Sequence, residues 1–180
     1  AAIESYKKAL EIKPDLASAY YNMGQAQHQS GHTYEAINSY RQSINIEPDN
    51  AEIQNKLGLV LAEIGELDSA INCYEQAIQI NPNAAHYYNN LGVAWYEKGA
   101  FDVTVDICKR SLEIKPTAEA YYNIGNALKE RQIMSESHDC YHRALQMNPD
   151  SAEIQICYAT IQAYLSNYDN VIKHCDLALE

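Results

Sequence analysis

Two histidines four residues apart are the side chains in this sequence whose spacing most suggests chemistry. His138 and His142 lie in a segment with helical periodicity, and this spacing can bring two imidazoles to one metal ion. No third ligand lies nearby in the sequence. We therefore predict ordinary surface histidines, with no metal and no cofactor.

The five cysteines are scattered singly, and their number is odd. No C-x-x-C pair occurs, which argues against a disulfide framework and against a zinc ribbon. There is also no G-x-S-x-G motif and no glycine-rich phosphate loop, and the adjacent His174 and Cys175 would lie on different helix faces. We predict reduced, mostly buried thiols, a cytoplasmic location and no catalytic site. The cysteines are Cys73, Cys108, Cys140, Cys157 and Cys175.

The charge balance narrows the class of partner. The chain has 24 acidic and 13 basic side chains, giving a net charge of −11. Nucleic-acid binding depends on clustered Lys and Arg, so nucleic acid is not expected as the ligand. No apolar stretch approaches the roughly 18 residues of a membrane span. A neutral or basic protein partner remains compatible with this composition.

An internal repeat indicates how the chain is organised. Four series of equivalent positions recur at a step of 34 residues, shortened once to 33 after residue 116. One series is proline, one is mostly tyrosine, one is small and one is mostly glycine. They are Pro14, Pro48, Pro82, Pro116, Pro149; Tyr6, Tyr40, Tyr74, Cys108, Tyr141, Cys175; Ala9, Ser43, Ala77, Ser111, Ala144, Ala178; and Gly24, Gly58, Gly92, Gly125, Ala159.

Each unit contains two segments with helical periodicity. Gly31, Gly65 and Gly99 lie between the two segments, where a residue with positive φ ends a helix at little cost. Each proline then ends the second helix. In the last two units Gln132 and Ser166 replace the turn glycine, so we expect strained or differently shaped turns there. The slender glycine series is expected to admit the bulky tyrosine series beside it.

These series resemble the signature of the tetratricopeptide repeat family. The resemblance implies an all-α, right-handed superhelical solenoid of antiparallel helix-turn-helix hairpins, with about eleven helices in a single array. Residues 1–14 would be the second helix of a preceding repeat. Full repeats would follow at 17–50, 51–84, 85–117 and 118–151, with an incomplete repeat at 152–180.

The resemblance also implies where a ligand binds. In this family the first helix of each hairpin lines a concave groove that holds peptides. The residues predicted for that groove are Asn22, Gln25, Glu52, Lys56, Glu63, Asn90, Glu97, Asn123, Asn126 and Glu130. Three asparagines in equivalent slots are similar to the asparagine ladder in the repeat arm of O-linked N-acetylglucosamine transferases. They could instead be tolerated polar residues that face water.

Function follows from the charges of this stripe. Glutamates outnumber the single lysine, Lys56, which favours a partner of opposite sign, although an acidic face that serves solubility is the alternative. Family members that clamp a chaperone's C-terminal carboxylate use paired cations, and the equivalent positions here supply no such pair. We expect an interaction scaffold for an extended peptide or helix of neutral-to-basic character; the alternative is the substrate-recognition arm of a larger enzyme such as a protein O-glycosyltransferase. End-to-end self-association is also expected, through Ile3, Tyr6 and Leu10 at one end and Val171, Ile172 and Leu179 at the other.

Overall fold

The described residues form helices and no strands. The computed structural model describes the backbone of residues 2–179 and the side chains of residues 2–167. The helices are α1 (Ala2–Ile12), α2 (Ala17–Gln29), α3 (Thr33–Ile46), α4 (Ala51–Glu63), α5 (Leu67–Ile80), α6 (Ala85–Glu97), α7 (Phe101–Ile114), α8 (Ala118–Glu130), α9 (Met134–Met147) and α10 (Ala152–Leu179). None of the helices described has both the length and the apolar composition of a membrane-spanning segment.

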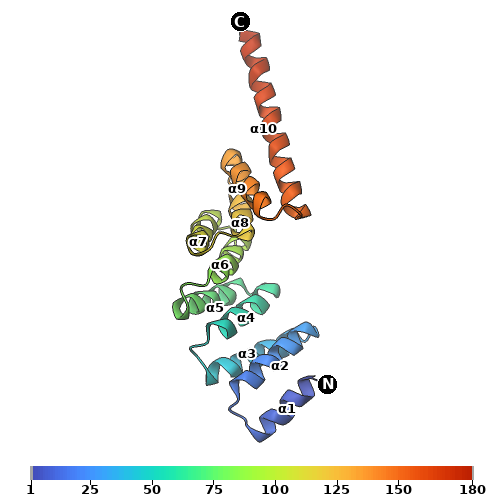
Figure 1. Ribbon diagram of the computed structural model, residues 1–180, viewed down its shortest axis with the longest axis vertical. Helices are drawn as coiled ribbons and strands as arrows, with labels where there is room; N and C mark the ends of the chain where they lie inside the picture. The colour runs from blue at the N-terminus through green and yellow to red at the C-terminus, as the bar shows by residue number, and fades with distance from the viewer. Residues whose placement is uncertain (1, 180) are drawn as a thin grey trace.

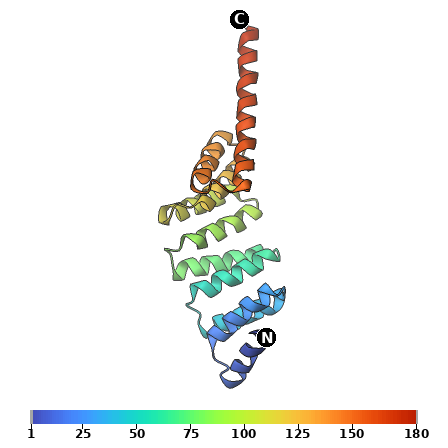
Figure 2. The ribbon, with the colours of Figure 1, turned by 45° about the vertical axis from the view of Figure 1, so that its right-hand side comes forward.

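The helices pair into hairpins that stack along one axis. Helices α2 and α3, α4 and α5, α6 and α7, and α8 and α9 form the four hairpins, and α1 packs on α2. The stack runs from the N-terminus to α9, and α10 projects beyond it as a straight helix (Figure 1). Figure 2 shows the same elongated stack after a turn of 45°. The predicted all-α solenoid of hairpins is confirmed.

The glycine and tyrosine series meet inside each hairpin. A Cβ atom built on Gly58 would lie 2.6 Å from the ring of Tyr74, and one on Gly92 would lie 2.5 Å from the sulfur of Cys108. The other two hairpins repeat this contact. Tyr74 and Cys108 are both almost fully buried. The absence of a side chain at the glycine therefore creates the space that the bulky residue fills.

The small-residue series also makes polar contacts where it contains serine. Ser43 Oγ donates a hydrogen bond of 2.8 Å to the carbonyl of Ala17, and Ser111 Oγ donates one of 2.9 Å to the carbonyl of Ala85. Both serines are fully buried. Each bond joins the end of a second helix to the beginning of the first helix in the same hairpin, so these buried hydroxyls are satisfied.

The turns inside the hairpins use the left-handed backbone region. Gly31, Gly65 and Gly99 have φ of 76°, 80° and 77°. Gln132 takes the same conformation with φ of 60°, although it is not glycine. The expected strain at this turn is therefore present, while the shape of the turn is retained.

Replacing Gln132 with glycine should stabilise the protein. We expect Gln132→Gly to raise the free energy of unfolding by about 0.5–1 kcal/mol, because glycine adopts this φ without a Cβ penalty. Urea unfolding followed by circular dichroism measures the change. Gln42→Gly, at an exposed position in the interior of helix α3, is the matched control and should instead lower stability by about 0.5–1 kcal/mol. Equal effects of the two substitutions would refute the strain at Gln132.

The last predicted hairpin does not form. No turn occurs at Ser166, and α10 continues as one helix to Leu179, so the structure has ten helices in residues 2–179 where about eleven were expected. In the four hairpins, a Cβ at the glycine position would come within 2.5 to 2.9 Å of the partner side chain. Ala159 carries that Cβ, and no glycine is present to form the turn. The expected partners Cys175 and Ala178 lie outside the described side chains, as do His174, Val171, Ile172 and Leu179.

Candidate functional site

The first helices of successive hairpins lie against one another on one side of the stack. Helix α4 contacts α6, and α6 contacts α8, in addition to the contacts within each hairpin. The ten residues predicted to bind a peptide all lie on α2, α4, α6 and α8, and all are half-buried or exposed. We call them the inner row: Asn22, Gln25, Glu52, Lys56, Glu63, Asn90, Glu97, Asn123, Asn126 and Glu130.

Glu52 neutralises the one lysine of the inner row. Lys56 Nζ lies 3.3 Å from Glu52 Oε1, one helical turn away. The hydroxyl of Tyr87 on the next first helix donates to Glu52 Oε2 at 3.4 Å, and His86 Nε2 lies 3.9 Å from the same oxygen. Lys56 is thus already paired and does not offer an unmatched positive charge to a ligand.

Further polar pairs join neighbouring first helices. His28 Nε2 and Glu63 Oε2 are 2.7 Å apart, joining α2 to α4. Asn90 Nδ2 donates to Oδ1 of the buried Asn55 at 2.7 Å, joining α6 to α4. Both pairs are separated by 35 residues in the chain. The inner row is therefore cross-linked from one hairpin to the next, and Asn90 keeps its amide oxygen and one amide hydrogen for a ligand.

Two other amides of the inner row are uncommitted. Asn22 and Asn123 are half-buried, and neither side chain has a hydrogen-bond partner among residues 2–167. Gln25 differs, because its Nε2 donates to the hydroxyl of Tyr21 at 2.8 Å. An asparagine amide offers one acceptor and two donor hydrogens, so Asn22 and Asn123 are suited to contact a peptide backbone.

A cavity of about 250 Å³ lies between α6, α8 and α10. It contains three residues of the inner row, together with two tyrosines, a valine and a further glutamate. We call it the tyrosine pocket; it is lined by Val93, Tyr96, Glu97, Tyr122, Asn123, Asn126 and Glu153.

Hydrogen bonds hold polar side chains that line this pocket. The hydroxyl of Tyr122 donates to Glu153 Oε1 at 2.6 Å, and burial together with this bond raises the pKa of Tyr122. Burial also raises the pKa of Tyr96, helped by the charge of Glu130 and by a hydrogen bond to it. Asn126 accepts a bond of 2.7 Å from the buried Tyr141. Both pocket tyrosines therefore stay neutral at ordinary pH.

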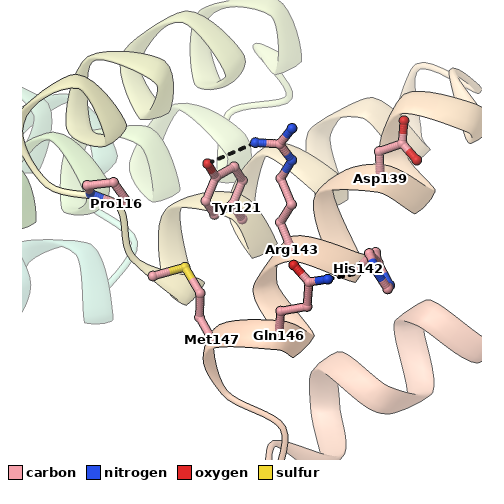
Figure 3. Close-up of a pocket in the computed structure, with 7 residues that line it drawn as sticks. All are labelled: Pro116, Tyr121, Asp139, His142, Arg143, Gln146 and Met147. Atoms are coloured by element: carbon pink, nitrogen blue, oxygen red, sulfur yellow. Dashed lines mark hydrogen bonds between the residues drawn. The ribbon is translucent and has the colours of Figure 1, made fainter.

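A larger cavity lies elsewhere, and no residue of the inner row lines it. It has a volume of about 580 Å³ and borders the loop before α8 and one side of α9 (Figure 3). Arg143 donates to the hydroxyl of Tyr121 at 3.4 Å and lies 5.7 Å from the centre of its ring. The remaining lining residues are Pro116, Asp139, His142, Gln146 and Met147. Tyr88 and Arg110 occupy the equivalent positions one unit earlier, a repeat in the sequence that could have drawn attention to this pair.

The two spaced histidines stack on each other and pack against a tyrosine. The rings of His138 and His142 are 6.4 Å apart and nearly parallel, and they lie 4.9 and 5.7 Å from the ring of Tyr158 on α10. Among the described residues, no group of three or more His, Cys, Asp and Glu is placed to hold a metal ion. The histidines thus contribute to the contact between α9 and α10.

The thiols are shielded. Burial raises the pKa of Cys73 to about 11 and that of Cys108 to about 12. It also raises the pKa of Cys140 to about 11. Thiolates are the reactive form of cysteine, so these three side chains behave as apolar filler at neutral pH. The prediction that Cys108 fills the core is confirmed.

Comparison with known proteins agrees with this architecture. A family model described as "TPR repeat" matches residues 1–31, 28–65 and 60–99, and one described as "Tetratricopeptide repeat" matches residues 118–151. No curated protein sequence matched the chain.

Solved structures include several with the same fold. A crystal structure of MamA is 26% identical, with a TM-score of 0.78 over 84% of this chain and 89% of MamA. YrrB, described as a TPR protein with an unusual peptide-binding site, is 22% identical, with a TM-score of 0.75 over 85% of this chain and 79% of YrrB. The first TPR of Spaghetti (RPAP3), bound to the HSP90 peptide SRMEEVD, is 23% identical, with a TM-score of 0.63 over 64% of this chain and 93% of its own. At the last two identities the likeness establishes the fold alone.

Proposed function

The chain belongs to the tetratricopeptide repeat family and is a protein-binding scaffold, and we propose that its inner row holds an extended peptide or helix of neutral-to-basic character. The observation that carries this proposal is the excess of glutamates over lysines in the inner row, beside uncommitted amides. The one lysine of the row is paired with Glu52, whereas Glu97 has no cationic partner among the described residues. A groove of one sign attracts a partner of the other sign and speeds its association.

The asparagines supply the contacts that do not depend on ligand sequence. Asn22 and Asn123 lie on α2 and α8, and Asn90 lies between them on α6. Amides at repeated positions can pair with the backbone of an extended ligand, which presents donors and acceptors at regular intervals. Carboxylates between them would then select the charge of the ligand side chains.

The expected preference for basic peptides distinguishes this chain from the RPAP3 domain, which was solved with an acidic peptide. The peptide SRMEEVD bound there carries three acidic residues and one basic one. The inner row offers such a peptide the unpaired carboxylate of Glu97 and no unpaired lysine. Glu63 and Glu130 add further carboxylates, which lie beside His28 and Lys129. Like charges facing each other oppose binding, so we expect SRMEEVD not to bind this groove.

Removing the three amides together tests the proposal. The probes are a panel of flexible glycine-serine peptides that carry several Lys and Arg residues, with SRMEEVD as the acidic reference. We expect the basic peptides to bind, and the variant Asn22→Ala/Asn90→Ala/Asn123→Ala to bind them about 10- to 100-fold more weakly, since each lost hydrogen bond contributes roughly 1 kcal/mol. Isothermal titration calorimetry at low and high salt measures both the affinity and its charge dependence.

A matched control uses asparagines on second helices. Asn38, Asn45 and Asn72 are exposed on α3 and α5, and replacing all three with alanine should leave peptide affinity unchanged. Unchanged affinity of the inner-row variant would overturn the assignment of the groove. Affinity that does not respond to salt would overturn the electrostatic part of the proposal alone.

The same groove would also serve a larger enzyme as its substrate-recognition arm. The asparagine slots support this second candidate, because backbone contacts accept many substrate sequences. The presence or absence of a catalytic domain in the same polypeptide is the feature that separates the two. End-to-end association of the outer repeats stays a prediction; Ile156, 67% exposed on α10, is an apolar side chain available for it.

A further inference from the structure

We propose that the tyrosine pocket is a recognition pocket for one arginine side chain of the peptide bound in the groove. This inference rests on the proposed function, and it assigns a specificity to one point of the inner row. The pocket lies where α6, α8 and α10 meet, so three successive repeat units contribute to it. Its volume of about 250 Å³ is below the roughly 300–1,000 Å³ of small-molecule sites, which suits a single long side chain.

The walls of the pocket are aromatic. Tyr96 and Tyr122 line it from α6 and α8, and Val93 adds an apolar surface. The hydroxyl hydrogen of Tyr122 is directed to the carboxylate of Glu153. This bond restricts the Tyr122 side chain before a ligand arrives. Fixed aromatic rings favour cations, and guanidinium groups in particular stack on them.

The negative charge of the pocket is not compensated. Glu97 and Glu153 line it from different helices, and neither forms an ion pair with any described residue. Tyr122 uses Oε1 of Glu153, which leaves Oε2 and both oxygens of Glu97 as acceptors. Asn123 adds an uncommitted amide. A neutral or acidic side chain would leave these carboxylates unmatched, whereas a cation would satisfy them.

Arginine fits this arrangement better than lysine. Its planar guanidinium carries five N–H donors directed outward and can bridge two carboxylates while its face lies on an aromatic ring. A lysine ammonium is a compact, strongly hydrated charge that would have to give up more of its hydration between the tyrosines. We therefore expect arginine first, lysine second and uncharged residues last.

Citrulline, the neutral isostere of arginine, provides the sharpest probe. Two glycine-serine peptides that differ only by arginine or citrulline at one position are compared by calorimetry on the folded protein. We expect the arginine peptide to bind about tenfold more tightly than the citrulline peptide, because one charge-assisted hydrogen bond contributes roughly that difference in affinity. In Glu97→Gln/Glu153→Gln this ratio should fall to about one. Glu75→Gln/Glu136→Gln removes the same charge from exposed positions on second helices, outside both the pocket and the inner row, and should keep the tenfold preference.

A second arm tests the pocket without the groove. N-acetyl-arginine amide is titrated against tyrosine-ring NMR signals, with Tyr96→Phe and Tyr122→Phe used to assign them, and N-acetyl-citrulline amide as the reference. Shifts of the Tyr96 and Tyr122 signals with the arginine compound alone are expected. Absence of these shifts, or a preference for arginine that survives in Glu97→Gln/Glu153→Gln, would overturn the pocket. If both peptides bind equally and the inner-row asparagine variant still abolishes binding, the groove stands and the pocket fails.

Discussion

Replacing Tyr74 with alanine is expected to lower the free energy of unfolding by about 3–5 kcal/mol. The ring is 2% exposed, packs on Gly58 of its own hairpin and belongs to a core that extends from Ala36 to Ala94. Removing it leaves a cavity against a residue that has no side chain with which to refill the space. Urea unfolding monitored by circular dichroism measures the loss as a lower midpoint of the transition.

An exposed tyrosine gives the matched control for Tyr74→Ala. Tyr34 on α3 is 71% exposed, so Tyr34→Ala should change stability by less than about 0.5 kcal/mol. In a stack of repeats each unit contacts only its neighbours, so the loss should be greatest around α4 and α5. Hydrogen exchange of the backbone amides in these two helices measures this local loss of stability. A loss as small as that of Tyr34→Ala would contradict the packing described for this series.

The hairpins could be predicted from the sequence because the residues of one contact, glycine against tyrosine, recur in several repeats. Glycine and tyrosine recur at matched positions. A glycine in the middle of a helix indicates that a bulky side chain from another helix packs against it. Gly58 with Tyr74 and Gly125 with Tyr141 are such pairs in the structure. The candidate groove residues were placed on first helices by the same repeat, and their contact with a ligand stays a prediction.

Two features could not be predicted from these series. Bonds such as Asn90 to Asn55 and Tyr122 to Glu153 join helices of different hairpins, so they depend on the angle between units, which no residue type specifies. We attribute the straight course of α10 to two substitutions together: Ser166 replaces the turn glycine, and Ala159 replaces the glycine that packs against the second helix. Gln132 shows that a turn survives without glycine, so the missing glycine at Ser166 is insufficient by itself; the Cβ of Ala159 adds an obstacle to the close approach of a second helix.

Introducing leucine at Gly58 is expected to destabilise the protein about as much as Tyr74→Ala, by roughly 3 kcal/mol or more. A Cβ alone would lie 2.6 Å from the Tyr74 ring, and a whole leucine must displace it. If the clash is the cause, leucine should partly fill the cavity left by Tyr74→Ala, and the double variant should cost at least 1 kcal/mol less than the two single losses together. Gly65→Leu is the control, because nothing lies within 4 Å of a Cβ at this position. Its φ of 80° means that the substitution costs about 1–2 kcal/mol of backbone strain. Adding Tyr74→Ala should leave that cost unchanged. Strict additivity of Gly58→Leu and Tyr74→Ala in a urea-denaturation cycle would show that the missing side chain and the buried ring do not share one space.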